Sequence, residues 1–142
     1  MTRDQLILAA LASNAGELSP VQVQKVLFLL DKKAAAWTGG PHFNFRPYDY
    51  GPFDSSIYKS LSQLRDDGLV EINGDATSKQ RSYAVTAEGR KQGSDILASI
   101  DPQISKYISE LTAFVRSLGF AQLVSSIYKE YPEMQANSVF RG

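Results

Sequence analysis

Two short runs of β-favouring residues, 69–72 and 81–86, constrain the fold of this chain more than any other feature. The polar segment 73–80 separates them, and its Asn73-Gly74 pair favours a turn. Most of the remaining chain has apolar residues at spacings of three and four, which is the periodicity of helices. The pattern therefore predicts one small β-hairpin within a mainly helical protein.

Three helices are predicted before this hairpin. The first covers residues 4–13, and the second follows Ser19 and covers residues 20–37. Its start is well marked, because a serine hydroxyl can cap free N–H groups and the next residue is a proline, which needs no hydrogen-bond partner there. The third helix opens at residue 54 or 55 and ends at Gly68.

After the hairpin, one helix is predicted from Thr86 to about Ile100, and two more lie between Pro102 and Pro132. The predicted fold class is mainly α with a small β-hairpin (α+β). The order of the elements is that of a winged helix-turn-helix followed by two C-terminal helices. We expect a winged-helix domain over residues 1–90, C-terminal helices over 91–132 in the same structural unit, and a tail over 133–142.

The composition fits one domain of ordinary size. The chain has 142 residues, of which 43% are hydrophobic and 21% charged, so it can bury a core. It has no cysteine, which excludes disulfides, thiolate metal sites and cysteine nucleophiles. No stretch approaches the roughly twenty apolar residues of a membrane-spanning helix. We expect a soluble, cytoplasmic protein with no membrane partner.

The third helix and the hairpin resemble a known family of regulators. Residues 56–70, SIYKSLSQLRDDGLV, resemble the recognition helix and first wing strand of the MarR and PadR regulators. Residues 83–90, YAVTAEGR, are similar to their second wing strand and the helix that follows. The resemblance covers residues 53–90 well and residues 1–37 in outline. It implies a DNA-binding transcription regulator that acts as a dimer.

A DNA-facing surface can be derived from the helix periodicity. If Ile57, Leu61 and Leu64 face the core, the polar residues between them face the opposite side. Serine, lysine and arginine side chains can bond phosphates or base edges, although a solvated polar face is the alternative. The predicted DNA-binding residues are Ser55, Lys59, Ser62 and Arg65 on the helix and Ser78, Lys79 and Arg81 on the hairpin.

The charge balance argues against strong DNA binding by one copy. Fifteen basic residues are matched by fifteen acidic ones, and the third helix itself has a slight negative excess. Few phosphates could be neutralised per copy, so a homodimer through residues 103–131 is expected to double the contacts. An ordinary core helix is the alternative for the apolar seam in this region, which consists of Ile104, Ile108, Leu111, Val115 and Leu118.

Residues 42–53, HFNFRPYDYGPF, separate the second and third helices where the regulators have a tight turn. The prolines predict extended chain or loop. Residues 24–30, QKVLFLL, followed by 48–53, YDYGPF, are similar to the Panacea or SocA-like antitoxin group. This resemblance implies a protein-interaction module of antitoxin or defence-accessory type, as the alternative to DNA binding. Its predicted partner-binding residues are Phe43, Phe45, Tyr48, Tyr50 and Phe53.

The sequence contains little that indicates catalysis. His42 is the single histidine, so a histidine metal cluster or a catalytic triad has no second member. No glycine-rich phosphate loop precedes a helix. We therefore predict no enzyme, no catalytic residues, no metal and no cofactor. Aromatic residues such as Phe120 and Tyr128 are either core residues or the lining of a small-ligand cleft, and the tail can dock on a partner or on its own domain.

Overall fold

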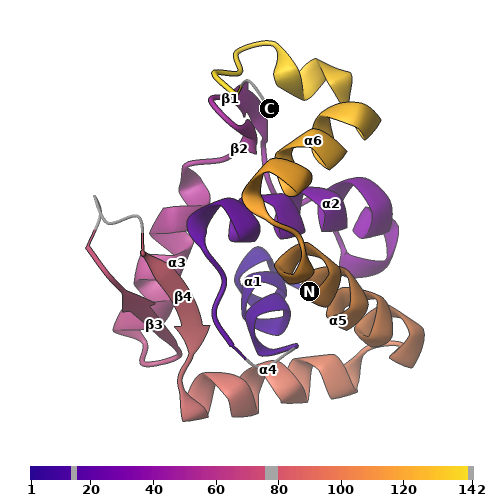
Figure 1. The fold of residues 1–142 in the computed structure, drawn as a ribbon. Helices are drawn as coiled ribbons and strands as arrows, with labels where there is room; N and C mark the ends of the chain where they lie inside the picture. Colours follow the sequence, from indigo (N-terminus) through magenta and orange to yellow (C-terminus); the bar gives the residue numbers. More distant parts are fainter. Residues whose placement is uncertain (14–15, 76–79, 141–142) are drawn as a thin grey trace.

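The computed structural model describes residues 1–13, 16–75 and 80–140. In these residues, six α-helices are accompanied by two small antiparallel β-hairpins, which confirms the mainly α, α+β class (Figure 1). The helices are α1 (Arg3–Ala12), α2 (Pro20–Thr38), α3 (Ser56–Asp66), α4 (Ala87–Ser99), α5 (Pro102–Ser117) and α6 (Phe120–Glu130), followed by the short 3-10 helix η1 (Pro132–Gln135). The strands are β1 (Arg46–Tyr48), β2 (Gly51–Phe53), β3 (Val70–Asn73) and β4 (Ser82–Val85).

Helix α1 is the centre of the core. Every residue from Leu6 to Ala12 is buried, because α2, α3, α4, α5 and β4 all pack around this helix. The spacings of Leu6, Ile7, Ala10 and Leu11 predict one apolar face for this helix, but Leu8 and Ala9 are equally buried. Helices that are apolar on all sides occupy the interior of a protein, and α1 does so here.

The boundaries of α2 and α3 lie within two residues of those that the sequence predicts. The Ser19 hydroxyl accepts a hydrogen bond from the Gln22 N–H at 3.2 Å, and the Gln22 side chain accepts one from the Ser19 N–H at 2.8 Å. The start of α3 uses Asp54, whose carboxylate accepts from the Ser56 N–H at 2.9 Å. The helix ends at Asp66, two residues before the predicted end at Gly68, which has a φ of +78° that glycine adopts without steric cost.

Hairpin β3–β4 has the predicted position, and the strands begin one residue later than the sequence indicates. Val70 pairs with Val85 and Asn73 pairs with Ser82. Leu18 adds an isolated antiparallel bridge to Tyr83, with N–H to carbonyl distances of 3.0 and 2.8 Å. The bridge anchors the segment before α2 on the hairpin.

Helix α4 lies very close to the rest of the core because of two glycines. A Cβ atom on Gly93 would stand 2.4 Å from the Ala12 Cβ, and one on Gly89 would stand 1.8 Å from the Leu69 carbonyl oxygen. The Thr86 hydroxyl caps α4 by accepting from the Gly89 N–H at 3.0 Å. The two glycines therefore let α4 pack closely against α1 and against the segment between α3 and β3.

Three helices follow the hairpin, and α5 and α6 are the two C-terminal helices of the predicted fold. Ile108 and Val115 of α5 are fully buried in the core of the chain itself, where α5 packs on α2. This arrangement corresponds to the core-helix alternative for the apolar seam. A homodimer through residues 103–131 stays a prediction, and its contacts would come from the outer face, where Phe114 is 55% exposed.

The segment predicted as extended chain or loop contains a hairpin, β1–β2. Arg46 pairs with Phe53 and Tyr48 with Gly51, which leaves a two-residue turn at Asp49 and Tyr50. The described part of the tail docks on this hairpin, since the Val139 N–H donates to the Asp49 carbonyl at 2.9 Å. In Figure 1 the last described residues of the tail accordingly lie beside β1 and β2. None of the helices in the described ranges is both long and apolar enough to span a membrane.

Candidate functional site

Polar side chains of α2 hold the β1–β2 hairpin and its flanks. The Asp31 carboxylate accepts hydrogen bonds from the backbone N–H groups of His42 and Phe43, at 3.0 and 2.9 Å. Gln24 is buried and pairs with the backbone of Asp54 twice, donating to its carbonyl at 3.0 Å and accepting from its N–H at 2.9 Å. The hairpin is therefore fixed to a rigid helix at both ends of the segment.

Asp54 ties this segment to α3. Its carboxylate accepts from the Asn44 N–H at 2.8 Å, from the Ser56 N–H at 2.9 Å and from the Ser56 hydroxyl at 2.6 Å. Burial alone would raise the pKa of Asp54, but these hydrogen bonds and the nearby charge of Arg3 lower it below its ordinary value. Asp54 is therefore held as a carboxylate that organises the loop and caps the helix.

Lys25 lies next to Gln24 on α2 and is the least expected residue of the region. Its side chain is buried, with 2% of the residue exposed, and its Nζ donates to the Pro52 carbonyl at 3.3 Å. Burial lowers the pKa of Lys25 from 10.5 to about 7. Gly51 lies beside this side chain with a φ of +105°, and a Cβ there would press on a ring carbon of Tyr128 at 3.3 Å while standing in ordinary contact with the Lys25 Cε at 3.6 Å.

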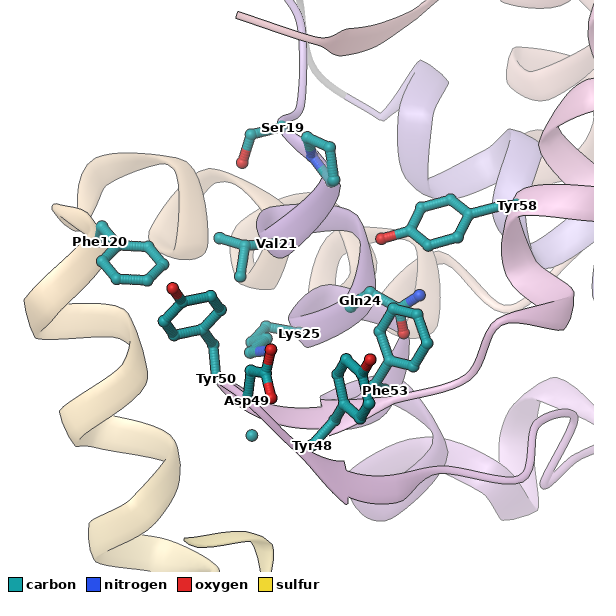
Figure 2. A pocket seen from close by; sticks show the side chains of 12 residues that line it. Ser19, Val21, Gln24, Lys25, Tyr48, Asp49, Tyr50, Phe53, Tyr58 and Phe120 are labelled. Carbon is teal, nitrogen blue, oxygen red and sulfur yellow. The ribbon is translucent and has the colours of Figure 1, made fainter. Parts of the chain in front are cut away.

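A cavity of about 390 Å³ opens above Lys25, between α2, the β1–β2 hairpin, Tyr58 of α3 and Phe120 of α6. Figure 2 shows Tyr50 and Phe120 on one side, Tyr48 and Phe53 on the other, and Lys25 between them. The Tyr50 and Phe120 rings meet edge to face at 5.1 Å, and the Tyr48 and Phe53 rings stack at 4.8 Å. The cavity thus has apolar walls and an amine at its base.

The five predicted partner-binding residues do not form one surface. Phe43 and Phe45 are half-buried and pack inward, where the Phe45 ring meets the buried Phe28 edge to face at 5.3 Å. Phe53 is half-buried and lines the cavity, whereas Tyr48 and Tyr50 are 52% and 43% exposed. Phe120, which is 47% exposed, joins these two tyrosines. We call Tyr48, Tyr50 and Phe120 the aromatic rim.

The structure brings together only some of the predicted DNA-binding residues. Ser55 and Lys59 are exposed at the start of α3, whereas Ser62 and Arg81 both line a hollow of about 340 Å³ between α3 and the β3–β4 hairpin. Arg65 forms an exposed ion pair with its neighbour Asp66 at 3.3 Å. The last two predicted residues, Ser78 and Lys79, lie outside the described residues.

Arg81 is engaged within its own hairpin. Its Nε donates to the Tyr83 hydroxyl at 3.2 Å, and its guanidinium carbon lies 5.8 Å from the centre of the Tyr83 ring. Releasing it to a phosphate would cost these contacts. Arg65 likewise has a partner, Asp66, so both arginines would have to give up contacts within the chain to reach a phosphate.

The sequence patterns assigned no site role to Gln24, Lys25 and Asp31, whereas Phe120, expected either in the core or in the lining of a small-ligand cleft, does line the cavity. A signal for Lys25 does exist, because Val21, Phe28 and Leu29 surround it at spacings of three and four. A charged residue flanked in this way on a helix lies on an apolar face. No local pattern indicates the roles of Gln24 and Asp31, because their partners are backbone groups elsewhere along the chain.

No protein-family model matches this chain, and a comparison with curated proteins finds no match. Within the described ranges, no group of three or more His, Cys, Asp and Glu residues is arranged to hold a metal ion.

Proposed function

We propose that this chain is a protein-interaction module of the antitoxin or defence-accessory type, built on a winged-helix scaffold, and that its partner docks on the aromatic rim. One observation carries the proposal: Tyr48 and Tyr50 stand on a hairpin fixed to α2 and, with Phe120, expose large apolar rings around a cavity. Aromatic residues beside a pocket are typical of the residues that dominate binding at protein interfaces.

The fixed position of the hairpin favours this function. A flexible loop loses conformational entropy when it binds, whereas a segment already held by Asp31, Gln24 and Asp54 loses little. Covering the exposed half of each rim ring contributes about 1 kcal/mol. An apolar segment of a partner that covers the rim and enters the cavity would combine these contributions.

Site-specific photocrosslinking tests the proposal. A benzoylphenylalanine residue replaces Tyr50 in one variant and exposed Lys91 of α4 in the matched control, both expressed in the native host. We expect a discrete protein adduct from position 50 that is absent from position 91. Adding Phe120→Ser to the position 50 variant should reduce that adduct severalfold. Equal adducts at the two positions, or none at either, would contradict the proposal.

DNA binding as a dimeric transcription regulator is the second candidate. The observation that favours it is the position of α3 beside the β3–β4 hairpin, with Ser62 and Arg81 around one hollow. A helix and a hairpin placed in this way can reach a major groove and the neighbouring backbone. Arg65 is paired with Asp66, and Arg81 is hydrogen-bonded to Tyr83. These contacts are the reason that we place this function second.

A salt series on duplex DNA from the region upstream of the coding sequence tests the second candidate. Lys59→Ala and Arg81→Ala should each weaken binding and reduce the slope of log affinity against log salt by about 1. Lys106→Ala on α5 is the control and should leave the slope unchanged. Identical slopes for all four proteins would count against DNA contact by α3 and the hairpin.

A further inference from the structure

Lys25 lies at the base of the cavity beneath the aromatic rim, where burial of its amine costs desolvation energy. Lys25 is 2% exposed, and among the described residues no carboxylate lies within ion-pair distance of its Nζ. Its one described hydrogen bond goes to the Pro52 carbonyl at 3.3 Å. Buried lysines normally have a charged partner, so this one differs from a structural ion pair.

The surroundings of the amine are those of a binding site for a small molecule. The cavity has a volume of about 390 Å³, within the range of ligand pockets. Val21, Tyr48, Tyr50, Phe53 and Phe120 supply its apolar walls. The titratable groups that share this lining are Asp49 and the hydroxyls of Tyr48, Tyr50 and Tyr58.

We propose that Lys25 is a nucleophilic amine that captures small aromatic aldehydes in this cavity as a Schiff base. A single aromatic ring fits between the tyrosine and phenylalanine walls, which places its carbonyl carbon toward the amine at the base (Figure 2). A desolvated lysine in an apolar pocket is an activated nucleophile because its uncharged form has a free lone pair. The hydrogen bond to Pro52 uses one N–H and leaves that lone pair available.

The reaction balances without an oxidant or reductant. The Nζ lone pair forms a bond to the aldehyde carbon, the carbonyl π electrons move to oxygen, and one proton passes from the nitrogen to that oxygen. The resulting carbinolamine loses its hydroxyl with a proton from solvent as water, the nitrogen lone pair forms the C=N bond, and the second nitrogen proton returns to solvent. Amine and aldehyde therefore give imine and water.

The uncharged fraction of Lys25 gives the expected rate advantage. Its pKa of about 7 leaves roughly half of the amine uncharged at neutral pH, against roughly one in 2,500 for a free lysine of pKa about 10.4. A less basic amine is also a weaker nucleophile, which removes part of this advantage. We expect reaction at least tenfold faster than that of Nα-acetyllysine.

Reductive trapping with benzaldehyde and cyanoborohydride at neutral pH tests the proposal, with peptide mass spectrometry to locate the adduct. We expect a benzyl adduct on Lys25 that forms at least tenfold faster than on Nα-acetyllysine in the same tube. Lys25→Met should fold and lose this adduct. Lys106→Met, on the exposed face of α5, should still form the adduct on Lys25. The Met1 α-amine can also react and serves as the internal reference.

A second variant separates binding from reactivity. Val21→Phe fills part of the cavity from α2 and should slow labelling of Lys25 severalfold without changing the pH dependence of folding stability. Labelling of Lys25 no faster than that of the exposed lysines, or equal labelling in urea-unfolded protein, would overturn the proposal. The experiment needs no protein partner, so its outcome is independent of the function proposed for the aromatic rim.

Discussion

Replacing Lys25 by methionine should stabilise the protein at neutral pH. The variant keeps the length of the side chain and removes an amine whose pKa burial lowers to about 7. An unfolded lysine has a pKa of about 10.4, and this difference corresponds to about 4 to 5 kcal/mol at pH 7. Loss of the hydrogen bond leaves the Pro52 carbonyl unpaired, at a cost of about 1 to 3 kcal/mol. We expect a net gain of about 2 kcal/mol in the free energy of unfolding.

The stability difference between the wild type and Lys25→Met should depend on pH. Between about pH 7 and pH 10.4 the unfolded chain holds a proton on Lys25 that the native chain has lost. The stability of the wild type therefore rises with pH in this window, by up to about 1.4 kcal/mol per pH unit. Below the window both states are protonated and the slope disappears. Lys25→Met lacks this contribution, so its advantage should shrink as the pH rises.

Urea unfolding followed by circular dichroism, between about pH 6 and pH 9, measures both quantities. Lys106→Met on the exposed face of α5 is the matched control and should follow the wild type at every pH. Parallel stability curves for wild type and Lys25→Met would refute the reasoning, because they would show that the native chain keeps Lys25 protonated. A large loss of stability in Lys25→Met at pH 7 would refute it as well.

Three further predictions concern packing, the loop carboxylate and assembly. Gly89→Ala should lower the free energy of unfolding by about 3 kcal/mol or more in urea, because its Cβ would stand 1.8 Å from a backbone oxygen, whereas Gly119→Ala should lose about 1 kcal/mol or less. Asp54→Asn should cost about 1 to 3 kcal/mol at neutral pH. Because the native pKa of Asp54 is lowered, its contribution is present above the ordinary carboxyl pKa and is lost as pH falls through the native value, so the cost should shrink in acid. If copies pair through residues 103–131, Phe114→Glu should convert a dimer into a monomer in sedimentation velocity, and an unchanged dimer would contradict that interface.

Local signals predicted the helices well because their causes are local. The caps at Ser19, Thr86 and Asp101 use a side-chain oxygen and an N–H group two or three residues further along. The same holds for Gly68, whose positive φ ends the segment that contains α3. These interactions form within one turn of chain, so a single sequence contains both partners at a fixed spacing.

The β1–β2 hairpin could not be predicted in this way. Pro47 and Pro52 face each other in its register, and a proline has no N–H to donate, so its sequence has the features of a loop. Distant residues supply the missing hydrogen bonds: Lys25 donates to the Pro52 carbonyl and the Asn137 side chain to the Pro47 carbonyl. The hairpin therefore depends on tertiary contacts that no local pattern contains.

The burial of Lys25 argues that this position serves more than the fold. A carbonyl such as that of Pro52 can be satisfied by a neutral donor, which avoids the cost of burying an amine. The Gln24 amide does this for the carbonyl of Asp54, two residues further along. Stability alone would therefore favour a neutral residue at position 25. The two proposals for the region can be separated with one variant: Lys25→Met keeps the aromatic rim and should retain the photocrosslinked partner, while the aldehyde adduct should disappear. Loss of the photocrosslinked partner as well would show instead that the amine shapes the rim itself.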